Sequence, residues 1–185
     1  MKKLWLRLKL MLLAFLPVCG FSNSWCMNRF PITWSIDTTT VRSLDISKYM
    51  GEWFEIARYE NRFERGMSHV KATYSLGENG KIRILNEGVK NGERMSTKGK
   101  GFIPDYEASP GRLRVSFFLW FYSDYYILEL DELDYTYAVI GSSRCDFLWI
   151  LYRYPVMPKE LLNQLLERIE KRGYDVSKLI YVNQT

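Results

Sequence analysis

The chain has 185 residues, a formal net charge of +5 and an aromatic content of 16%. That length suits one domain with a sizeable core. Four basic residues and no acidic residue lie in the first 19 positions, which leaves 22 basic and 21 acidic residues, a net charge of only +1, in the remainder. Nucleic-acid binding needs a concentrated basic face, so this balance argues against a nucleic-acid partner.

Residues 1–20 have the layout of an export signal. A basic start precedes the apolar run Leu10–Leu16, which is too short to span a membrane stably as a helix. The segment Leu16–Cys19 resembles a bacterial lipobox, with Val18 where the pattern has a small residue. We therefore expect a signal peptide or lipoprotein leader, with Cys19 as the lipidation site of a membrane anchor.

Two alternatives to the lipid anchor remain open. One is plain secretion after cleavage near residues 22–25. The other is a translation start at Met27, which would leave a cytoplasmic protein with no export signal. Residues 21–43 have few periodic signals and are interpreted as an N-terminal tether, either mobile or wrapped around the domain.

The cysteines and the single histidine indicate neither a disulfide framework nor a metal site. Cys19 and Cys26 precede the domain, and Cys145 stands alone within it. Cys145 is therefore expected to be a free, half-buried thiol unless Cys26 reaches it. His69 has no partner at a metal-ligand spacing, so we expect no metal and no cofactor.

A train of short strands with turn signals between them follows, which is the pattern of an antiparallel sandwich or barrel. Before the strands, Leu44–Met50 is predicted to form one helical turn that plugs one end. The Asn-Gly pairs at 79–80 and 91–92 predict hairpin turns, because these residues accept positive φ angles. Gly99 and Gly101 suggest a bend or bulge. The predicted strands span residues 52–60, 69–76, 81–88, 94–103, 111–118, 125–131, 135–141 and 147–152.

Strand 69–76 alternates cleanly between apolar and polar residues, whereas the last three strands are apolar on both faces and need a cover. The predicted helix 158–172 has one apolar stripe that can supply this cover. A final strand at 179–182 is expected to pair near the first strand. The prediction is an all-β fold over residues 44–185: an eight-stranded antiparallel up-and-down barrel with one external C-terminal helix and a short final strand. Such a barrel has room for one small ligand.

Three blocks of this predicted barrel resemble the lipocalin family. The span Asp45–Ile56, with its Gly-x-Trp step, resembles the N-terminal lipocalin signature. Asp134–Gly141 and Asp146–Arg153 resemble the second and third blocks. The extension Glu55–Gly66 is similar to the bacterial outer-membrane lipocalin lipoproteins of the Blc type and to apolipoprotein-D-like lipocalins. The resemblance covers about residues 44–184.

The resemblance implies a lipid-binding protein that holds a fatty acid, lysophospholipid or similar amphiphile in the barrel, for storage or transport linked to membrane maintenance. It also implies an outer-membrane lipoprotein of the cell envelope that faces the periplasm. It gives structural roles, rather than ligand contacts, to Gly51, Trp53, Asp134 and Arg153. Arg153 is expected to lie on the indole of Trp53 at the closed end of the barrel.

The aromatic residues exceed what one structural core needs, so we expect part of them to line a ligand site that also has a few polar groups. Glu55 and Glu129 are interpreted as a polar pocket wall or as outward-facing residues; a wall position would need Arg58 to neutralise the charge. The loop at residues 119–122 could be buried in a homodimer or at a bilayer surface. The predicted ligand-binding residues are Phe54, Arg58, Phe63, Arg65, Tyr74, Phe117, Trp120, Tyr125 and Tyr137.

An enzyme would need a positioned nucleophile, base or metal. The sequence has no Gly-x-Ser-x-Gly elbow, no phosphate loop and no Cys–His pair at a telling spacing. A lone strand histidine such as His69 is more typical of a surface position. We therefore expect a binding protein and no enzyme. Two alternatives stay open: a lipocalin-fold enzyme that acts on a lipid, and a purely structural, membrane-tethered lipoprotein with a solidly packed barrel.

Overall fold

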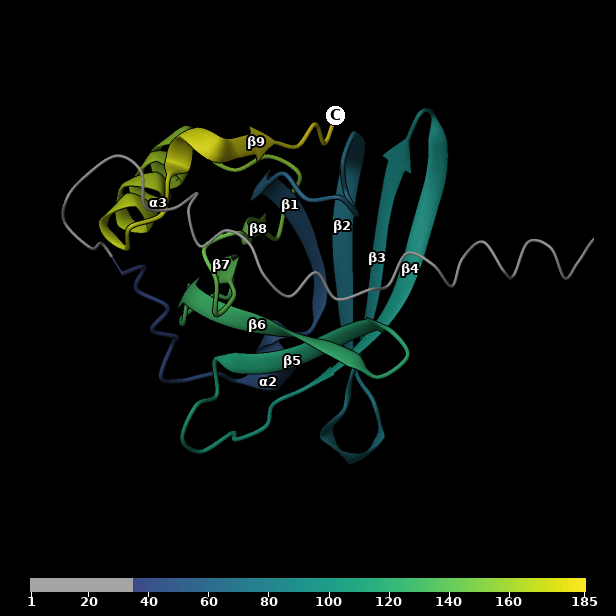
Figure 1. The fold of residues 1–185 in the computed structure, drawn as a ribbon, viewed down its shortest axis with the longest axis vertical. Helices are drawn as coiled ribbons and strands as arrows, with labels where there is room; N and C mark the ends of the chain where they lie inside the picture. Colours follow the sequence, from purple (N-terminus) through teal and green to yellow (C-terminus); the bar gives the residue numbers. More distant parts are fainter. Residues whose placement is uncertain (1–34) are drawn as a thin grey trace, which may run out of the picture. The chain divides into compact units, whose positions relative to one another are not determined.

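Eight antiparallel strands close into a barrel in the computed structural model, and a ninth strand is added beside the first (Figure 1). The structure describes residues 35–185, so the predicted leader, Cys19 and most of the tether lie outside the described residues. The predicted fold class is confirmed. The strands are β1 (Gly51–Tyr59), β2 (Met67–Leu76), β3 (Ile82–Lys90), β4 (Glu93–Phe102), β5 (Arg112–Phe118), β6 (Phe121–Leu130), β7 (Tyr137–Gly141), β8 (Leu148–Tyr152) and β9 (Leu179–Tyr181).

The two ends of the barrel differ. The one-turn helix α2 (Ile46–Tyr49) precedes β1 and lies at one end, which we call the closed end. Asp45 caps this helix by accepting hydrogen bonds from the backbone N–H groups of Ser47 and Lys48. Because successive strands are antiparallel, the β1–β2, β3–β4, β5–β6 and β7–β8 connections all lie at the opposite end, which we call the open end.

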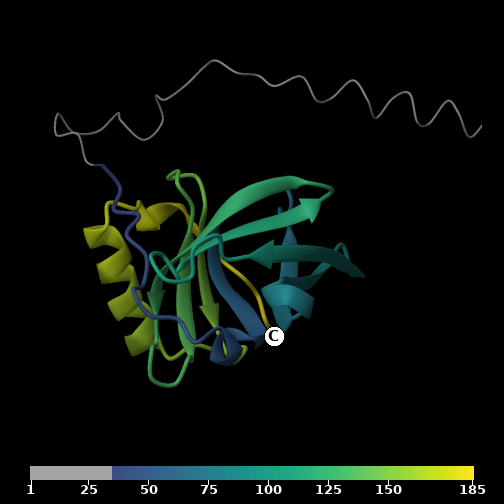
Figure 2. The ribbon, with the colours of Figure 1, turned by 90° about the horizontal axis from the view of Figure 1, so that it is seen from below.

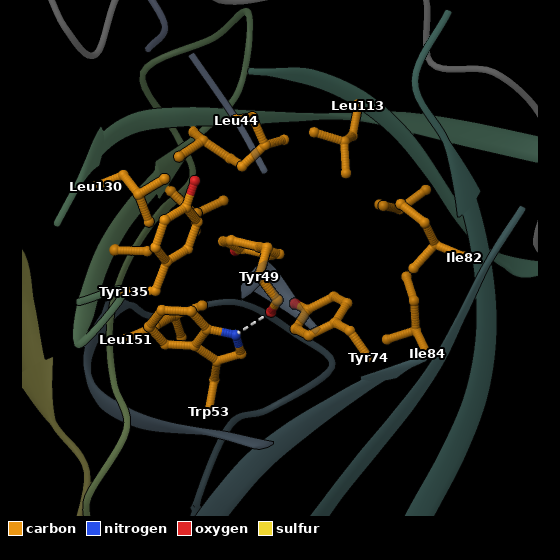
Figure 3. Packing of buried hydrophobic residues seen from close by; sticks show 14 residues of the cluster. Leu44, Tyr49, Trp53, Tyr74, Ile82, Ile84, Leu113, Leu130, Tyr135 and Leu151 are labelled. Carbon is orange, nitrogen blue, oxygen red and sulfur yellow. Dashed lines mark hydrogen bonds between the residues drawn. The ribbon is translucent and has the colours of Figure 1, made fainter. Parts of the chain in front are cut away.

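Side chains on the two faces of the barrel wall form two separate cores. The inner cluster fills the interior toward the closed end (Figure 3). The outer cluster lies between the barrel wall and a helix. The buried members of the inner cluster are Leu44, Tyr49, Trp53, Tyr74, Ile82, Ile84, Leu113, Val115, Ile127, Leu130, Tyr135, Ala138, Ile140 and Leu151. The buried members of the outer cluster are Ile56, Ala57, Tyr59, Leu128, Val139, Leu148, Ile150, Met157, Leu165, Ile169, Tyr174 and Leu179.

Helix α3 (Lys159–Lys171) covers the outer face of β6, β7 and β8, as its apolar stripe predicts (Figure 2). Residues 35–43, which we call the strap, run along the same flank. The Asp37 amide donates to the Arg172 carbonyl over 2.9 Å, and the Val41 amide donates to the Ile127 carbonyl over 3.0 Å. Of the two interpretations of the tether, the wrapped one therefore describes these residues.

The C-terminal segment completes the barrel wall. β1 pairs with β2 only over Gly51–Phe54, and β9 continues the sheet beside the rest of β1. The Gln184 amide group donates to the carbonyl oxygens of Glu55 in β1 and Val70 in β2, each over 2.7 Å. The His69 amide donates to the Asn183 carbonyl over 2.7 Å. The last residues therefore fill the wall where β1 and β2 separate.

The bulges do not lie where the glycines suggested. The β3–β4 ladder has no register shift at Gly99 or Gly101. A Cβ on Gly99 would lie 2.6 Å from the Phe117 ring, so this glycine makes room for an aromatic side chain. A bulge that was not predicted lies at the start of β2, where the register shifts between Ser68 and Lys71 and His69 has a φ of 52°, while Val70 and Tyr74 are buried as the predicted alternation requires.

Other local predictions divide between confirmation and correction. Both Asn-Gly hairpin turns are confirmed: Asn79 and Asn91 have φ angles of 58° and 53°, and the glycines that follow them also have positive φ. The prediction of a free thiol at Cys145 is wrong, because this residue is disulfide-bonded. None of the helices in the described part of the chain is long and apolar enough to cross a membrane.

Candidate ligand-binding site in the barrel

The closed end is sealed by one tryptophan and one arginine. Trp53 is fully buried, and its indole N–H donates to the Tyr49 carbonyl over 2.8 Å (Figure 3). The guanidinium carbon of Arg153 lies 3.8 Å from the centre of a Trp53 ring, as the resemblance implies. The same guanidinium donates to the carbonyl oxygens of Lys48, Tyr49, Glu52 and Tyr135. The pair therefore fixes helix α2 to the barrel and seals this end of the interior.

Three buried phenols meet in the interior above this seal. The Tyr125 hydroxyl lies 2.6 Å from the Tyr49 hydroxyl and 3.0 Å from the Tyr74 hydroxyl. Burial raises the pKa of each of these phenols above its ordinary value, so all three keep their protons. Three hydroxyl protons and two hydrogen bonds leave one O–H donor without an acceptor among the described residues.

A buried ion pair lies on the same inner wall. β1 shifts register against β8 between Glu55 and Ala57, so Ile56 and Ala57 both face the outer cluster and Arg58 returns to the inner face. The Arg58 Nη1 lies 2.6 Å from the Glu55 Oε1, and both side chains are at most 5% exposed. A charge pair so well shielded from water is costly unless every polar group is satisfied.

The β1–β2 loop folds over this ion pair. Arg58 donates to the Glu64 carbonyl over 2.6 Å, and the indole N–H of Trp149 donates to the Glu64 carboxylate over 3.0 Å. The Arg58 Nε is buried and has no acceptor within hydrogen-bond distance in the described residues. The interior thus presents two unused donors, the Arg58 Nε and one tyrosine hydroxyl, in a largely apolar wall.

The charge state of Glu55 depends on pH. Burial away from water raises its pKa to about 8, and repulsion from Glu64 acts in the same direction, while Arg58 opposes both. Glu55 is therefore mostly protonated at neutral pH, and the site then carries less negative charge than its two carboxyl groups suggest.

This protonation predicts an unusual dependence of stability on pH. The unfolded chain releases the Glu55 proton near pH 4.5, whereas the folded chain holds it to about pH 8. Between these values the unfolded state binds fewer protons, so the free energy of unfolding should fall as pH rises. We expect Glu55→Gln to flatten this fall in thermal unfolding measured from pH 5 to pH 8. Glu60→Gln, at an exposed pair with Arg65, should keep it; an unchanged slope in Glu55→Gln would contradict the assignment.

The structure separates the predicted ligand-binding residues into three groups. Arg58, Tyr74 and Tyr125 lie in the interior, and Phe117 covers Gly99 on the inner face near the open end. Three others lie in connections at the open end and are exposed: Phe63, Arg65 and Trp120.

Phe54 and Tyr137 are corrections, because both face the outer cluster instead of the interior. Alternation decides this position: Trp53 points inward, so its neighbour Phe54 points outward. Tyr137 lies under α3, with the Arg168 guanidinium 5.7 Å from its ring centre. Glu129 is also outside, where it pairs with Arg168 and Arg172 over 2.8 and 3.1 Å.

Four residues of the site or its frame were not predicted in these roles. Tyr49 precedes β1 and Glu64 follows it, where strand periodicity gives no signal. Trp149 could have been predicted to face the interior from its alternation with Leu148 and Ile150. Asp131, and not the exposed Asp134, holds the β6–β7 turn, because its carboxylate accepts four hydrogen bonds from this turn. The signal for Asp131 is its position before the turn, where a short carboxylate can accept backbone N–H groups.

A barrel with one sealed end and a few buried polar groups in an apolar interior is a small-ligand-binding barrel. The protein-family model described as lipocalin-like domain matches residues 44–184. The chain belongs to the lipocalin family, whose members bind small hydrophobic ligands. His69, the one histidine, is exposed at the bulge of β2 and does not reach the interior.

Three curated relatives illustrate the similarity. The outer membrane lipoprotein Blc of Vibrio cholerae is 37% identical over 146 residues, which cover 78% of this chain and 85% of the relative. The protein of that name from Escherichia coli K12 is 39% identical over 150 residues, with 79% and 82% covered. Apolipoprotein D of Mus musculus is 32% identical over 149 residues, with 77% and 78% covered.

Solved structures agree on the fold. Insecticyanin from the tobacco hornworm superposes with a TM-score of 0.66 at 23% identity, with 80% of this chain and 85% of that chain covered. Apocrustacyanin C1 superposes with a TM-score of 0.63 at 17% identity, with 76% and 80% covered.

Proposed function

We propose that the barrel holds one amphiphile, a fatty acid, a lysophospholipid or a similar lipid, for storage or transport linked to membrane maintenance. The observation that carries this proposal is the pair of unused buried donors. They are the Arg58 Nε and one hydroxyl of the tyrosine group, which consists of Tyr49, Tyr74 and Tyr125. A buried donor without an acceptor costs free energy. A head group with carboxylate, phosphate or ester oxygens would satisfy both donors, and its chain would lie against apolar side chains.

The charge of the site fits such a head group. Two carboxylates beside a carboxylate or phosphate ligand would repel it. With Glu55 protonated below about pH 8, the Arg58 cation is opposed by Glu64 alone. Binding of an anionic amphiphile should therefore weaken as pH rises through this range.

We further propose that the protein is a lipoprotein of the cell envelope, anchored through Cys19. Three observations support this location. The first 20 residues have the layout of a lipoprotein leader. The bacterial relatives above carry the name outer membrane lipoprotein. Cys145 is disulfide-bonded, which is typical of an oxidising compartment.

Native mass spectrometry of the full chain, before and after delipidation, tests the binding proposal. We expect an adduct of lipid mass that is lost on extraction and restored by added lysophospholipid or fatty acid. Tyr125→Phe removes the central hydroxyl of the tyrosine group and should weaken rebinding about tenfold, a hydrogen-bond effect of about 1.4 kcal/mol. Tyr126→Phe, on the outward face of the same strand, is the matched control. A bare protein that takes up no added amphiphile would favour the solidly packed structural barrel instead.

One observation favours the enzyme alternative, and it can be tested directly. Glu55 is an inward-facing acid with a pKa raised to about 8, the kind of group that can act as a general acid or base. We propose binding without catalysis, because the described residues give Glu55 an arginine partner and no nucleophile beside it. Conversion of bound lipid by the wild-type protein, abolished in Glu55→Gln, would overturn this proposal.

A further inference from the structure

The barrel wall is incomplete near the open end. β3 and β4 pair over nine residue pairs, from Ile82 with Gly101 to Lys90 with Glu93. β4 and β5 pair over only three, from Lys100 with Ser116 to Phe102 with Arg114. The β3–β4 and β5–β6 hairpins consequently diverge beyond these pairs (Figure 1). The β5–β6 hairpin therefore extends from the barrel without a neighbouring strand along its β4 side.

The end of this hairpin is apolar and exposed. Residues 117–121, which we call the aromatic tip, are between 41% and 71% exposed. Phe121 stacks against Phe118 and Trp120, with ring centres 6.4 and 6.1 Å apart. Leu119 adopts a φ of 50° at the turn. Such a run of exposed apolar residues marks an interaction surface rather than ordinary protein surface.

Three cations lie along the outer face of β4, the strand whose last residues pair with β5. Lys98 and Lys100 alternate with the inward-facing Gly99 and Gly101, and Arg94 lies nearer the β3–β4 turn; all three are exposed. None of the three forms a salt bridge within the part of the chain that the structure describes. The Lys100 Nζ lies 5.8 Å from the Tyr122 ring centre, and Phe102 contacts the same ring at 5.3 Å. This basic row, Arg94, Lys98 and Lys100, is therefore joined to the base of the hairpin.

We propose that the aromatic tip inserts into the surface of an anionic lipid bilayer, with the basic row against the head groups. Aromatic rings prefer the boundary between acyl chains and head groups, and cations beside them gain from anionic lipids. A second copy of the chain fits this surface less well, because a two-fold contact would bring two basic rows together. The proposal does not rest on lipid carriage, since a solidly packed barrel could dock in the same way.

Partition into vesicles tests the surface, using the full chain with Cys19→Ser so that no acyl anchor contributes. We expect binding to vesicles of phosphatidylglycerol and phosphatidylcholine and weaker binding to phosphatidylcholine alone. The double variant Trp120→Ser, Phe121→Ser should bind about tenfold more weakly. The triple variant Arg94→Ala, Lys98→Ala, Lys100→Ala should lose on the order of 100-fold on anionic vesicles, and little on neutral ones.

Matched controls come from exposed residues elsewhere on the domain. Leu133→Ser with Val156→Ser removes two exposed apolar side chains outside the β5–β6 hairpin, 83% and 68% exposed. Lys81→Ala with Lys159→Ala and Lys171→Ala removes three cations outside the basic row. Both controls should bind as the parent does, and thermal unfolding should show every variant to be folded.

Two results would overturn the proposal. One is equal vesicle binding by parent, tip variant and basic-row variant. The other is loss of a dimer in the tip variant with unchanged vesicle binding, which would assign the tip to a second copy. Quenching of tryptophan fluorescence by brominated lipids measures insertion locally. This quenching should be weaker in Trp120→Phe. If the protein bound vesicles but took up no amphiphile, the proposed lipid carriage would be wrong and the proposed membrane docking would stand.

Discussion

Replacing Arg58 with Met should lower the free energy of unfolding by about 2–5 kcal/mol at pH 7.5, because it leaves two buried acceptors, the Glu55 carboxyl group and the Glu64 carbonyl, without their charged donor. The guanidinium is 2% exposed and also holds the Glu64 carbonyl, so the loop that follows β1 would lose its attachment too. Urea unfolding measures the change. Because Glu55 is already mostly protonated at pH 7.5, the loss should be nearly the same at pH 5.

Two further variants separate the lost ion pair from lost packing. Arg65→Met breaks an exposed pair with Glu60 and should cost at most about 1 kcal/mol. Glu55→Met combined with Arg58→Met removes both members of the pair and should be much more stable than Arg58→Met alone, because no buried carboxyl group is left without its donor. If the double variant were as unstable as the single one, the effect would come from packing and the buried acid would be irrelevant.

A buried pair that is costly to keep suggests a reason other than stability. The inner wall places Arg58, Glu55 and the phenol of Tyr125 in an apolar interior, where aliphatic side chains would pack with fewer demands. A binding site needs a few oriented polar groups for specificity. The same variants should therefore separate in two assays: the double Met variant is expected to fold stably and to bind amphiphile poorly.

The architecture could be predicted because its signals are local and repeated. Asn-Gly turns fix hairpins, and an apolar stripe at helical spacing fixes the covering helix α3. The direction of single side chains could not be predicted, because one bulge reverses the alternation that follows it. Arg58 faces inward only because β1 has a bulge after Glu55, and no residue type in β1 indicates this bulge.

Phe54 shows the other source of error. Its position follows from alternation with Trp53, yet aromatic character alone made it a ligand candidate. Glu64 shows a third source, because its partner Trp149 lies far away in the sequence. Contacts between loops depend on the closed barrel, and strand periodicity contains no information about them.

Replacing Arg153 with Met should lower the free energy of unfolding by about 2–4 kcal/mol, from one cation–π contact and the hydrogen bonds of a charged donor. The methionine keeps an apolar stem over Trp53 and removes the donors to the carbonyl oxygens of Lys48, Tyr49, Glu52 and Tyr135. These carbonyls belong to α2, β1 and the β6–β7 turn, so the closed end should loosen as a unit. Hydrogen exchange of the α2 and β1 amides should rise locally while the β3–β4 ladder keeps its protection.

The control and the conservative variant decide what Arg153 contributes. Arg144→Met, at an exposed arginine 3.6 Å from Asp146, should change the free energy of unfolding by less than about 0.5 kcal/mol. Arg153→Lys keeps the charge over the indole but cannot reach four carbonyl oxygens with one ammonium group, so it should recover less than half of the loss. Full recovery by lysine would mean that the cation–π contact alone seals the barrel. No loss in Arg153→Met would mean that α2 is held by the Trp53–Tyr49 hydrogen bond and the inner cluster without this arginine.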